Sequence, residues 1–263
     1  MINLDIFCPE TTTVWSFPER GTWATHNPKY RGNWAPQIPK NLILKYTNEN
    51  DLILDPMMGA GTTLIEAKFL NRNAVGIDIN KNAVELTKKN LLFDVKNNSI
   101  QEVVEGDARD LSKFSNDYFD FILTHPPYLN IIKYSEGKIA EDLSNISSLN
   151  KFLNEFKVAV KEMYRVLKPN KYCAILIGDT RRRKHYVPLA YRVMDLFLSE
   201  GFILKEDIIK TQHNCKATPR WSSMVSNYDF YLIMHEHLFI FRKPDIDEDI
   251  SIFKDSCLLT SLN

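Results

Sequence analysis

Cysteine is scarce in this sequence and is never clustered. The four cysteines, Cys8, Cys173, Cys215 and Cys257, lie far apart, and none belongs to a Cys-x-x-Cys pair. Such spacing suggests neither a zinc site nor a disulfide framework. We therefore expect no metal, and a reducing cytoplasm is the simplest setting.

Long apolar runs and excess charge are missing too. No apolar stretch approaches the ~20 residues that a membrane-spanning helix needs, and the first ten residues do not resemble a signal peptide, so we expect no membrane contact. Lysine plus arginine and aspartate plus glutamate each number 33, which leaves a formal net charge of zero. A nucleic-acid surface would therefore have to come from local clustering of charge.

Short apolar runs alternate with longer amphipathic segments over most of the chain. After residues 1–40, which are expected to form loops and short turns, the pattern predicts helices at 38–46, 62–70, 82–91, 151–167 and 186–200. It predicts strands at 51–55, 74–78, 100–105, 119–124, 172–178, 203–210 and 237–242. This alternation predicts a mostly parallel sheet with helices on both faces, with an antiparallel pair at the end. Ligands of such a sheet bind beyond the carboxyl ends of its strands.

A glycine-rich turn follows the first of these strands, in the segment Asp55-Pro-Met-Met-Gly-Ala-Gly-Thr-Thr63. Gly59 and Gly61 would let the backbone approach a ligand closely, and the next helix would offer free N–H groups to a carboxylate. Asp78 ends the second strand, where an acid can bind ribose hydroxyls, and Asp107 follows the third, where it could contact an adenine amino group. Together these residues predict a nucleotide-type cofactor.

Each part of this pattern has a simpler interpretation. A single Gly-x-Gly turn is common, and Asp78 and Asp107 could be helix caps or loop residues. A nicotinamide cofactor is an alternative, but the full Gly-x-Gly-x-x-Gly pattern is missing. Three acids at three successive strand ends favour the cofactor interpretation.

A second motif, Thr124-His-Pro-Pro-Tyr128, follows the fourth strand. Its two prolines fix φ and extend the backbone, so a carbonyl and a side chain are held in a set direction. Tyr128 offers a flat face for stacking a base, a contact worth about 1–3 kcal/mol. Methylation of an amine needs such a site, with two acceptors for the amino protons and no covalent nucleophile. The simpler alternative is a rigid turn with a core tyrosine.

With both motifs in place, the sequence resembles the DNA amino-methyltransferases, which make N6-methyladenine or N4-methylcytosine. The residues that carry the resemblance are the glycine-rich turn, the Thr124–Tyr128 motif, Tyr30-Arg-Gly-Asn-Trp-Ala-Pro-Gln37 and His235-Glu-His-Leu-Phe-Ile-Phe-Arg-Lys243. The resemblance extends from about Tyr30 to Lys243. It implies a Rossmann-like class I methyltransferase fold with a seven-stranded sheet, and S-adenosyl-L-methionine as the cofactor.

The resemblance also implies roles for particular residues. His125, Pro126, Pro127 and Tyr128 would hold the target amine and stack its base, and Thr62 and Thr63 would cap the helix after the glycine turn. The residues expected to bind the cofactor are Trp34, Pro36, Asp55, Pro56, Met57, Gly59, Gly61, Thr62, Thr63, Asp78, Ile79, Asp107 and Ala108.

His125 departs from the family, which usually has Asp, Asn or Ser at this position. A neutral imidazole can accept one hydrogen bond through a ring nitrogen, whereas a protonated one cannot. The carbonyl of Pro126 could then be the more important acceptor. The departure also removes the residue that usually helps to distinguish adenine from cytosine as the target base. The order of the two motifs favours adenine only slightly.

A flipped base must be held by contacts to the strand. The residues expected to bind nucleic acid are Arg181, Arg182, Arg183, Lys184, Lys216, Arg220 and Trp221. The alternative for 181–184 is a solvated charged turn. We expect one catalytic domain over residues 1–245. In it, 1–40 would close over the cofactor, 129–150 and 211–230 would contact the target, and 246–263 would form a tail.

Other functions stay open at this point. An RNA guanine-N2 methyltransferase would share the Pro-Pro-Tyr chemistry, and a methyltransferase-like subunit could bind DNA for a catalytic partner without turning over. We expect no large separate recognition domain, so a homodimer is one hypothesis. A cognate restriction endonuclease is a possible partner.

Overall fold

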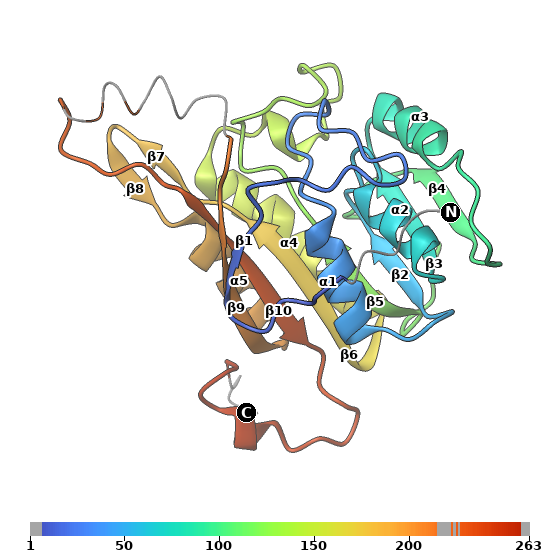
Figure 1. Ribbon diagram of the computed structural model, residues 1–263. Coiled ribbons are helices and arrows are strands. Elements are labelled where there is room, and N and C mark those ends of the chain that lie inside the picture. The colour runs from blue at the N-terminus through green and yellow to red at the C-terminus, as the bar shows by residue number, and fades with distance from the viewer. Residues whose placement is uncertain (1–6, 215–221, 223–224, 226, 259–263) are drawn as a thin grey trace.

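The computed structural model describes residues 7–258 except 215–221, 223–224 and 226. Its centre is a sheet of eight strands in the order β1-β9-β10-β6-β5-β2-β3-β4. Figure 1 shows this sheet crossing the molecule, with β4 at one edge. The strands are β1 (Val14–Ser16), β2 (Leu52–Asp55), β3 (Asn73–Asp78), β4 (Gln101–Glu105), β5 (Phe119–Thr124), β6 (Leu167–Ile177), β9 (Ile203–Thr211) and β10 (His235–Arg242).

Helices cover both faces of the sheet, as the alternating pattern predicts. One face packs against α1 (Gln37–Tyr46), α2 (Thr62–Phe69) and α3 (Lys81–Asn90), and the other packs against α4 (Leu149–Val166) and α5 (Leu189–Ser199). Strands β4, β3, β2, β5 and β6 are parallel, and β10 is antiparallel to β6 and β9. The expected antiparallel pair at the end is therefore confirmed.

The expected number of seven strands is wrong, because the N-terminal segment adds an eighth. Strand β1 pairs in parallel with β9, with Trp15 opposite Lys210. Only Trp15 of its three residues is buried, and its indole N–H donates to the Thr12 carbonyl at 2.8 Å. Three residues with a single buried side chain give too little periodicity to be distinguished from a loop.

The start predicted for the helix at 186–200 is too early. The structure has a two-stranded hairpin instead, formed by β7 (Thr180–Arg182) and β8 (His185–Val187), and α5 begins only at Leu189. Arg183 and Lys184 both have positive φ, 49° and 69°, which is the backbone of a tight hairpin turn. Such a turn without glycine or asparagine has no clear sequence signature.

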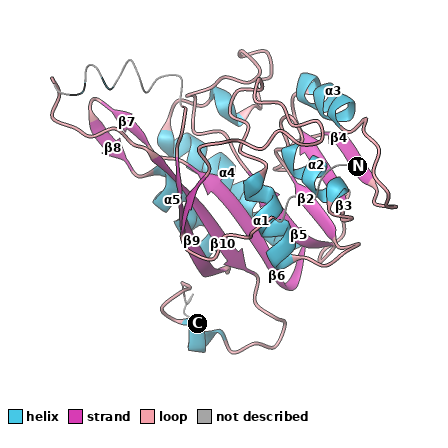
Figure 2. Ribbon diagram, in the orientation of Figure 1, coloured by secondary structure: helices cyan, strands magenta, loops and turns pink. Residues whose placement is uncertain are grey.

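The carboxyl ends of the parallel strands lie together on one side of the molecule, and the long loops gather above them (Figure 2). These loops include residues 17–36 and 125–148, the second with a short 3₁₀ helix, η1 (Leu143–Asn145). At the opposite ends of the strands, residues 243–258 fold back, and the Leu204 N–H donates to the Ser256 carbonyl at 2.8 Å. None of the helices in the described part of the chain is long and apolar enough to cross a bilayer.

Candidate functional site

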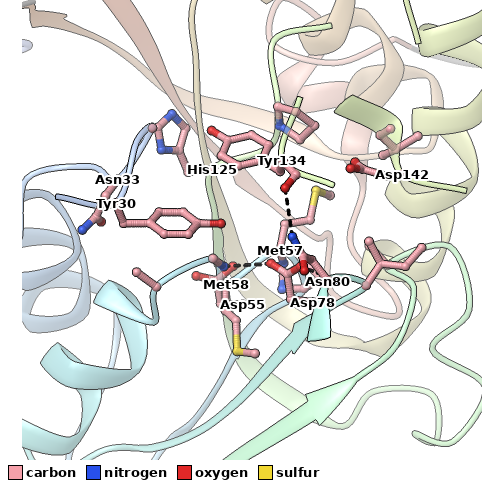
Figure 3. A pocket seen from close by; sticks show the side chains of 18 of the residues that line it. Tyr30, Asn33, Asp55, Met57, Met58, Asp78, Asn80, His125, Tyr134 and Asp142 are labelled. Carbon is pink, nitrogen blue, oxygen red and sulfur yellow. Dashed lines mark hydrogen bonds between the residues drawn. The ribbon is translucent and has the colours of Figure 1, made fainter. Parts of the chain in front are cut away.

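An open cleft of about 810 Å³ lies at the carboxyl ends of β2, β3, β4 and β5. Figure 3 shows side chains from four separate segments pointing into it. The lining residues are Tyr30, Gly32, Asn33, Trp34, Asp55, Pro56, Met57, Met58, Gly59, Ala60, Asp78, Ile79, Asn80, Asp107, Ala108, His125, Pro127, Tyr134, Glu141, Asp142 and Leu143.

The glycine-rich turn forms the floor of the cleft. Gly59 and Gly61 have φ of 52° and 78°, which glycine adopts without strain. A Cβ on Gly61 would lie 2.5 Å from Cγ2 of Thr87, so the turn packs too closely on α3 for any side chain. The Gly59 N–H donates to Oδ2 of Asp78 at 3.0 Å, which joins the turn to the end of β3.

The two threonines after the turn do not cap the helix as expected. The N-cap of α2 is Gly61, and no side chain caps it. The hydroxyl of Thr62 donates to Oδ1 of Asn33, and that of Thr63 donates to Oδ2 of Asp55 at 2.6 Å. The two hydroxyls therefore tie the turn to the N-terminal segment and to the end of β2. Neither threonine lines the cleft, nor do Gly61 and Pro36.

Carboxyl groups at three strand ends face the cleft, as the sequence predicts. Burial raises the pKa of Asp55 to about 7 and that of Asp78 to about 6, although hydrogen bonds to each oppose the shift. Asp107 is paired with Arg109 at 2.6 Å. The loop after β5 adds Glu141 and Asp142, which the sequence analysis missed because no strand end or motif marks them. A cleft this acidic favours a cationic ligand.

Aromatic rings form the wall of the cleft opposite the floor. The Tyr30 ring stacks on Tyr134, with centroids 6.0 Å apart and planes 12° apart. Trp34 stacks on His125, with centroids 5.4 Å apart. Segment 17–36 and the loop after β5 thus meet over the floor, and both contribute to the lining. That the N-terminal segment closes over a ligand stays a prediction.

The Thr124–Tyr128 loop borders the same cleft. His125 and Pro127 line it, whereas Pro126 is buried and Tyr128 does not line it. The ring of Tyr128 instead packs against Gly178, where a Cβ would lie 2.7 Å from Cε2 of Tyr128. The Tyr128 hydroxyl donates to Oε1 of Glu236 at 2.8 Å and lies 2.6 Å from Nε2 of His125.

Glu236 is a member of the site that the sequence analysis missed. Its other oxygen, Oε2, pairs with Nζ of Lys210 at 2.9 Å. Burial raises the pKa of Glu236, but the charge of Lys210 and the hydrogen bonds from Lys210 and Tyr128 bring it below its usual value. Burial lowers the pKa of His125 to about 4, so its imidazole is neutral at pH 7. An acid at the start of β10 gives no sequence signal, since only the sheet order places it here.

The basic cluster lies on the β7–β8 hairpin, beside the same edge of the sheet. Arg181 donates to the Tyr231 carbonyl at 2.8 Å and stacks over Phe230, and Arg182 donates to the Ser147 carbonyl. Arg183 and Lys184 are exposed at the turn. The other residues expected to bind nucleic acid, Lys216, Arg220 and Trp221, lie outside the described residues.

Solved structures with the same fold define the class of protein. A SAM-dependent methyltransferase from Methanosarcina mazei superposes with a TM-score of 0.53 at 18% identity, over 78% of this chain and 97% of that one. TrmN from Thermus thermophilus gives 0.55, also at 18% identity, over 82% and 51%. A methyltransferase-domain model matches residues 54–131. The fold is therefore that of a Rossmann-like, S-adenosylmethionine-dependent methyltransferase.

The family follows from a second model, described as DNA methylase, which matches residues 7–89 and 119–256. The chain belongs to this family, and its cofactor is S-adenosylmethionine. The cleft fits that cofactor. Gly59 lines the floor, where a Cβ would lie 3.2 Å from Cε1 of Tyr30, and the acidic lining suits a ligand with a sulfonium and an ammonium group.

Three curated relatives match parts of the chain. The type II methyltransferase M.HpaI of Haemophilus parainfluenzae is 30% identical over 147 residues, which are 56% of this chain and 43% of the relative. M2.LlaDCHI of Lactococcus lactis subsp. cremoris is 42% identical over 82 residues, 30% and 29%. A tRNA (guanine(10)-N2)-dimethyltransferase of Methanothermobacter thermautotrophicus is 37% identical over 119 residues, 43% and 33%. Each match spans less than half of the relative.

Proposed function

We propose that this chain transfers the methyl group of S-adenosylmethionine to the exocyclic amino group of adenine (N6) or cytosine (N4) in DNA. The observation that carries the proposal is the position of the His125–Tyr128 loop on the cofactor cleft. Thr124 fixes this loop by donating to Oδ1 of Asp55 at 3.1 Å, so the two motifs share one frame. DNA is proposed as substrate from the family and from the type II methyltransferase relatives. The motif order slightly favours adenine.

The cleft would hold the cofactor by its floor and its carboxyl groups. Asp78 would accept from the ribose hydroxyls, Asp107 would face the adenine end, and Asp55 and the glycine turn would face the methionine end. When bound, S-adenosylmethionine supplies an electrophilic methyl group on its sulfonium sulfur. Tyr30 and Trp34 would exclude water from that end, because their stacked pairs form the wall over the floor.

The hydrogen bonds around Tyr128 set the proton position on His125. Glu236 is ionised and can only accept, so the Tyr128 hydroxyl gives its proton to Glu236 and its oxygen must accept from His125. The proton of the neutral imidazole is therefore on Nε2, and Nδ1 carries a free lone pair. Among the described residues, none forms a hydrogen bond with this Nδ1.

A neutral His125 can then do what an amide or carboxylate oxygen does in other members of the family. We infer that Nδ1 of His125 and the Pro126 carbonyl accept the two amino protons of the target base. This orientation turns the nitrogen lone pair toward the methyl group. After transfer, one of these two acceptors would take the proton lost from the methylated nitrogen and pass it to water.

The target base has to leave its duplex, which costs a few kcal/mol. Contacts from the β7–β8 hairpin and from residues 129–150 and 211–230 would hold the strand while the base is flipped. The stacking role of Tyr128 stays a prediction, since its ring packs on Gly178. A homodimer partner and a cognate restriction endonuclease also stay proposals.

One relative supports a second candidate function, methylation of guanine N2 in RNA, because its name describes that activity on tRNA. The third alternative is a DNA-binding subunit that does not turn over. A methyl-transfer assay tests all three. Labelled S-adenosylmethionine is offered with duplex DNA, single-stranded DNA or RNA, and the product nucleosides are separated.

Labelled N6-methyladenine or N4-methylcytosine supports the proposal and identifies the base. The label must depend on this chain, so the Asp55→Ala variant, which is expected to lose cofactor binding, is the control. Label in RNA alone overturns the DNA proposal in favour of the second candidate. Cofactor binding without transfer to any polymer overturns it in favour of the third.

A further inference from the structure

We propose that Asp179, His235 and His237 form a binding site for one divalent transition-metal ion, with Zn²⁺ the best match. One ligand atom from each residue lies within 4.8 Å of the other two. Asp179 follows the end of β6, and the two histidines begin β10, which pairs with β6 through His237 and Ile177. Scattered cysteines and local spacing in the sequence predict no metal, whereas the sheet assembles this cluster.

His237 provides the strongest evidence. The residue is 2% exposed, and its Nε2 has no hydrogen-bond partner among the described residues. Its Nδ1 lies 3.0 Å from Oδ1 of Asp207 on β9. An aspartate only accepts, so Nδ1 carries the proton and Nε2 presents a bare lone pair. A buried, unpartnered acceptor costs free energy unless a cation or a donor reaches it.

The geometry around that lone pair suits a metal. Nε2 of His237 lies 3.6 Å from Oδ2 of Asp179, too far for a hydrogen bond. Two acceptors at this separation match neighbouring ligands of a tetrahedral zinc ion, whose bonds are about 2.0–2.2 Å long. A histidine that ligates through Nε2 usually donates its other N–H to a carboxylate, which is the arrangement of His237 and Asp207.

The remaining two ligands are placed consistently. Asp179 is oriented by the Ala190 N–H, 2.8 Å from Oδ1, and by the Tyr186 hydroxyl on Oδ2. His235 lies two residues before His237 on β10, so both side chains project from the same face of the sheet. Their ring centroids are 5.3 Å apart, and the half-buried His235 gives an ion a route from solvent.

Two imidazoles and one carboxylate are ligands that Zn²⁺ and neighbouring divalent transition metals accept. A metal here would join the end of β6, the start of β10 and, through Asp179, the junction between β8 and α5. Glu236 lies between the two ligand histidines but projects from the other face, toward Tyr128. Metal binding would therefore fix the base of the hairpin and the strand that carries Glu236, without depending on the proposed reaction.

The test is metal binding by the full chain, purified without a tag and stripped with EDTA. Isothermal titration with Zn²⁺ and elemental analysis after dialysis are expected to give one ion per chain. His235→Gln is expected to weaken binding at least tenfold, and Asp207→Asn by about 10–100-fold through its effect on His237. His185→Gln, which changes an exposed histidine on the same hairpin outside the cluster, is the matched control and should bind normally.

Substitution of Co²⁺ supplies a measurement that does not rely on the stability of a variant. Visible absorption bands of tetrahedral intensity are expected in the wild-type chain and are lost on adding excess Zn²⁺. The proposal is overturned if the stripped wild-type chain takes up no Zn²⁺. It is also overturned if a folded His235→Gln variant, checked by circular dichroism, binds as tightly as the control.

Discussion

Thr124 and Asp55 are 69 positions apart in the sequence and share a buried hydrogen bond of 3.1 Å. It joins the last residue of β5 to the last residue of β2, so the His125–Tyr128 loop and the glycine-rich turn are held in one frame. Asp55 also accepts from Thr63 and from the Met57 N–H. Even with three donors, burial keeps the pKa of Asp55 at about 7.

This raised pKa predicts a pH-dependent cost of folding. An aspartate whose folded pKa exceeds its unfolded value of 3.8 favours the folded state most at low pH, where it is protonated in both states and carries no penalty of buried charge. That contribution is lost as the pH rises from about 4 to about 7. In Asp55→Asn the amide oxygen can accept from Met57 and Thr124, and the amide N–H₂ can donate to the Thr63 hydroxyl. We expect the free energy of unfolding of this variant to rise by a few kcal/mol relative to that of wild type over this range. Urea unfolding of both cofactor-free chains at pH 5 and pH 8 measures the change, and parallel pH curves would contradict the expectation.

The relay from Lys210 through Glu236 and Tyr128 to His125 predicts a loss of turnover in Glu236→Gln. Lys210 would attract the carbonyl of the new amide, so the amide N–H₂ would face Tyr128 and donate to it. Tyr128 would then donate to Nε2 of His125, and the proton of the imidazole would move to Nδ1. Because an oriented acceptor would be lost, kcat should fall about 10–100-fold with cofactor affinity nearly unchanged.

Two further measurements separate the relay from a general structural effect. The ¹⁵N shifts of His125 should report proton transfer from Nε2 to Nδ1, and Tyr128→Phe, which breaks the relay without altering Lys210, should lower kcat similarly. Glu206→Gln on β9, outside the cleft, is the control. A Glu236→Gln variant with wild-type kcat and an unchanged His125 tautomer would show that the relay has no role.

The β7–β8 hairpin should act on nucleic acid through its exposed turn. Arg181 and Arg182 already donate to backbone carbonyls, so substituting them would disturb the hairpin itself. Arg183→Gln removes an exposed charge, and DNA affinity at low salt should fall with the slope of log K against log salt reduced by about 1. Lys254→Gln, an exposed lysine in the segment at the opposite ends of the strands, should leave both unchanged. Equal salt slopes for the two variants would show that the hairpin does not contact DNA.

Gly61 should tolerate no side chain, because of both backbone strain and a clash with Thr87. A comparison with Gly137 can separate these two effects. Gly61 and Gly137 have nearly the same φ, 78° and 81°, but a Cβ on Gly137 would meet no described residue within 4 Å. Gly137→Ala should therefore cost about 1 kcal/mol from backbone strain alone. Gly61→Ala should cost at least about 2 kcal/mol more, since it also clashes with Thr87. Thermal unfolding of both variants measures the difference, and equal losses would mean that α3 moves away freely.

Much of the floor of the cleft could be predicted from local sequence. Strands β2 and β3 and the turn at Gly59 and Gly61 each carry a short-range signal, either an apolar run or a residue suited to positive φ. Because parallel strands end at a common edge, Asp55, Asp78 and Asp107 could be placed together without knowing the sheet order. The Thr124–Tyr128 loop could be placed beside them for the same reason. The hydrogen bonds from Thr62 and Thr63 to Asn33 and Asp55, in place of a cap on α2, had no such local signal.

Only the tertiary structure could decide which distant side chains complete these sites. Glu236 reaches Tyr128, and Asp179 reaches His237, because β10 inserts antiparallel between β6 and β9. Strand β1 was missed because one buried tryptophan sets no period. The sequence by itself determined the elements and motifs, since these depend on residues near each other in the chain. The partners of His125 and His237 depend on sheet order and register, because these bring together side chains from strands far apart in sequence.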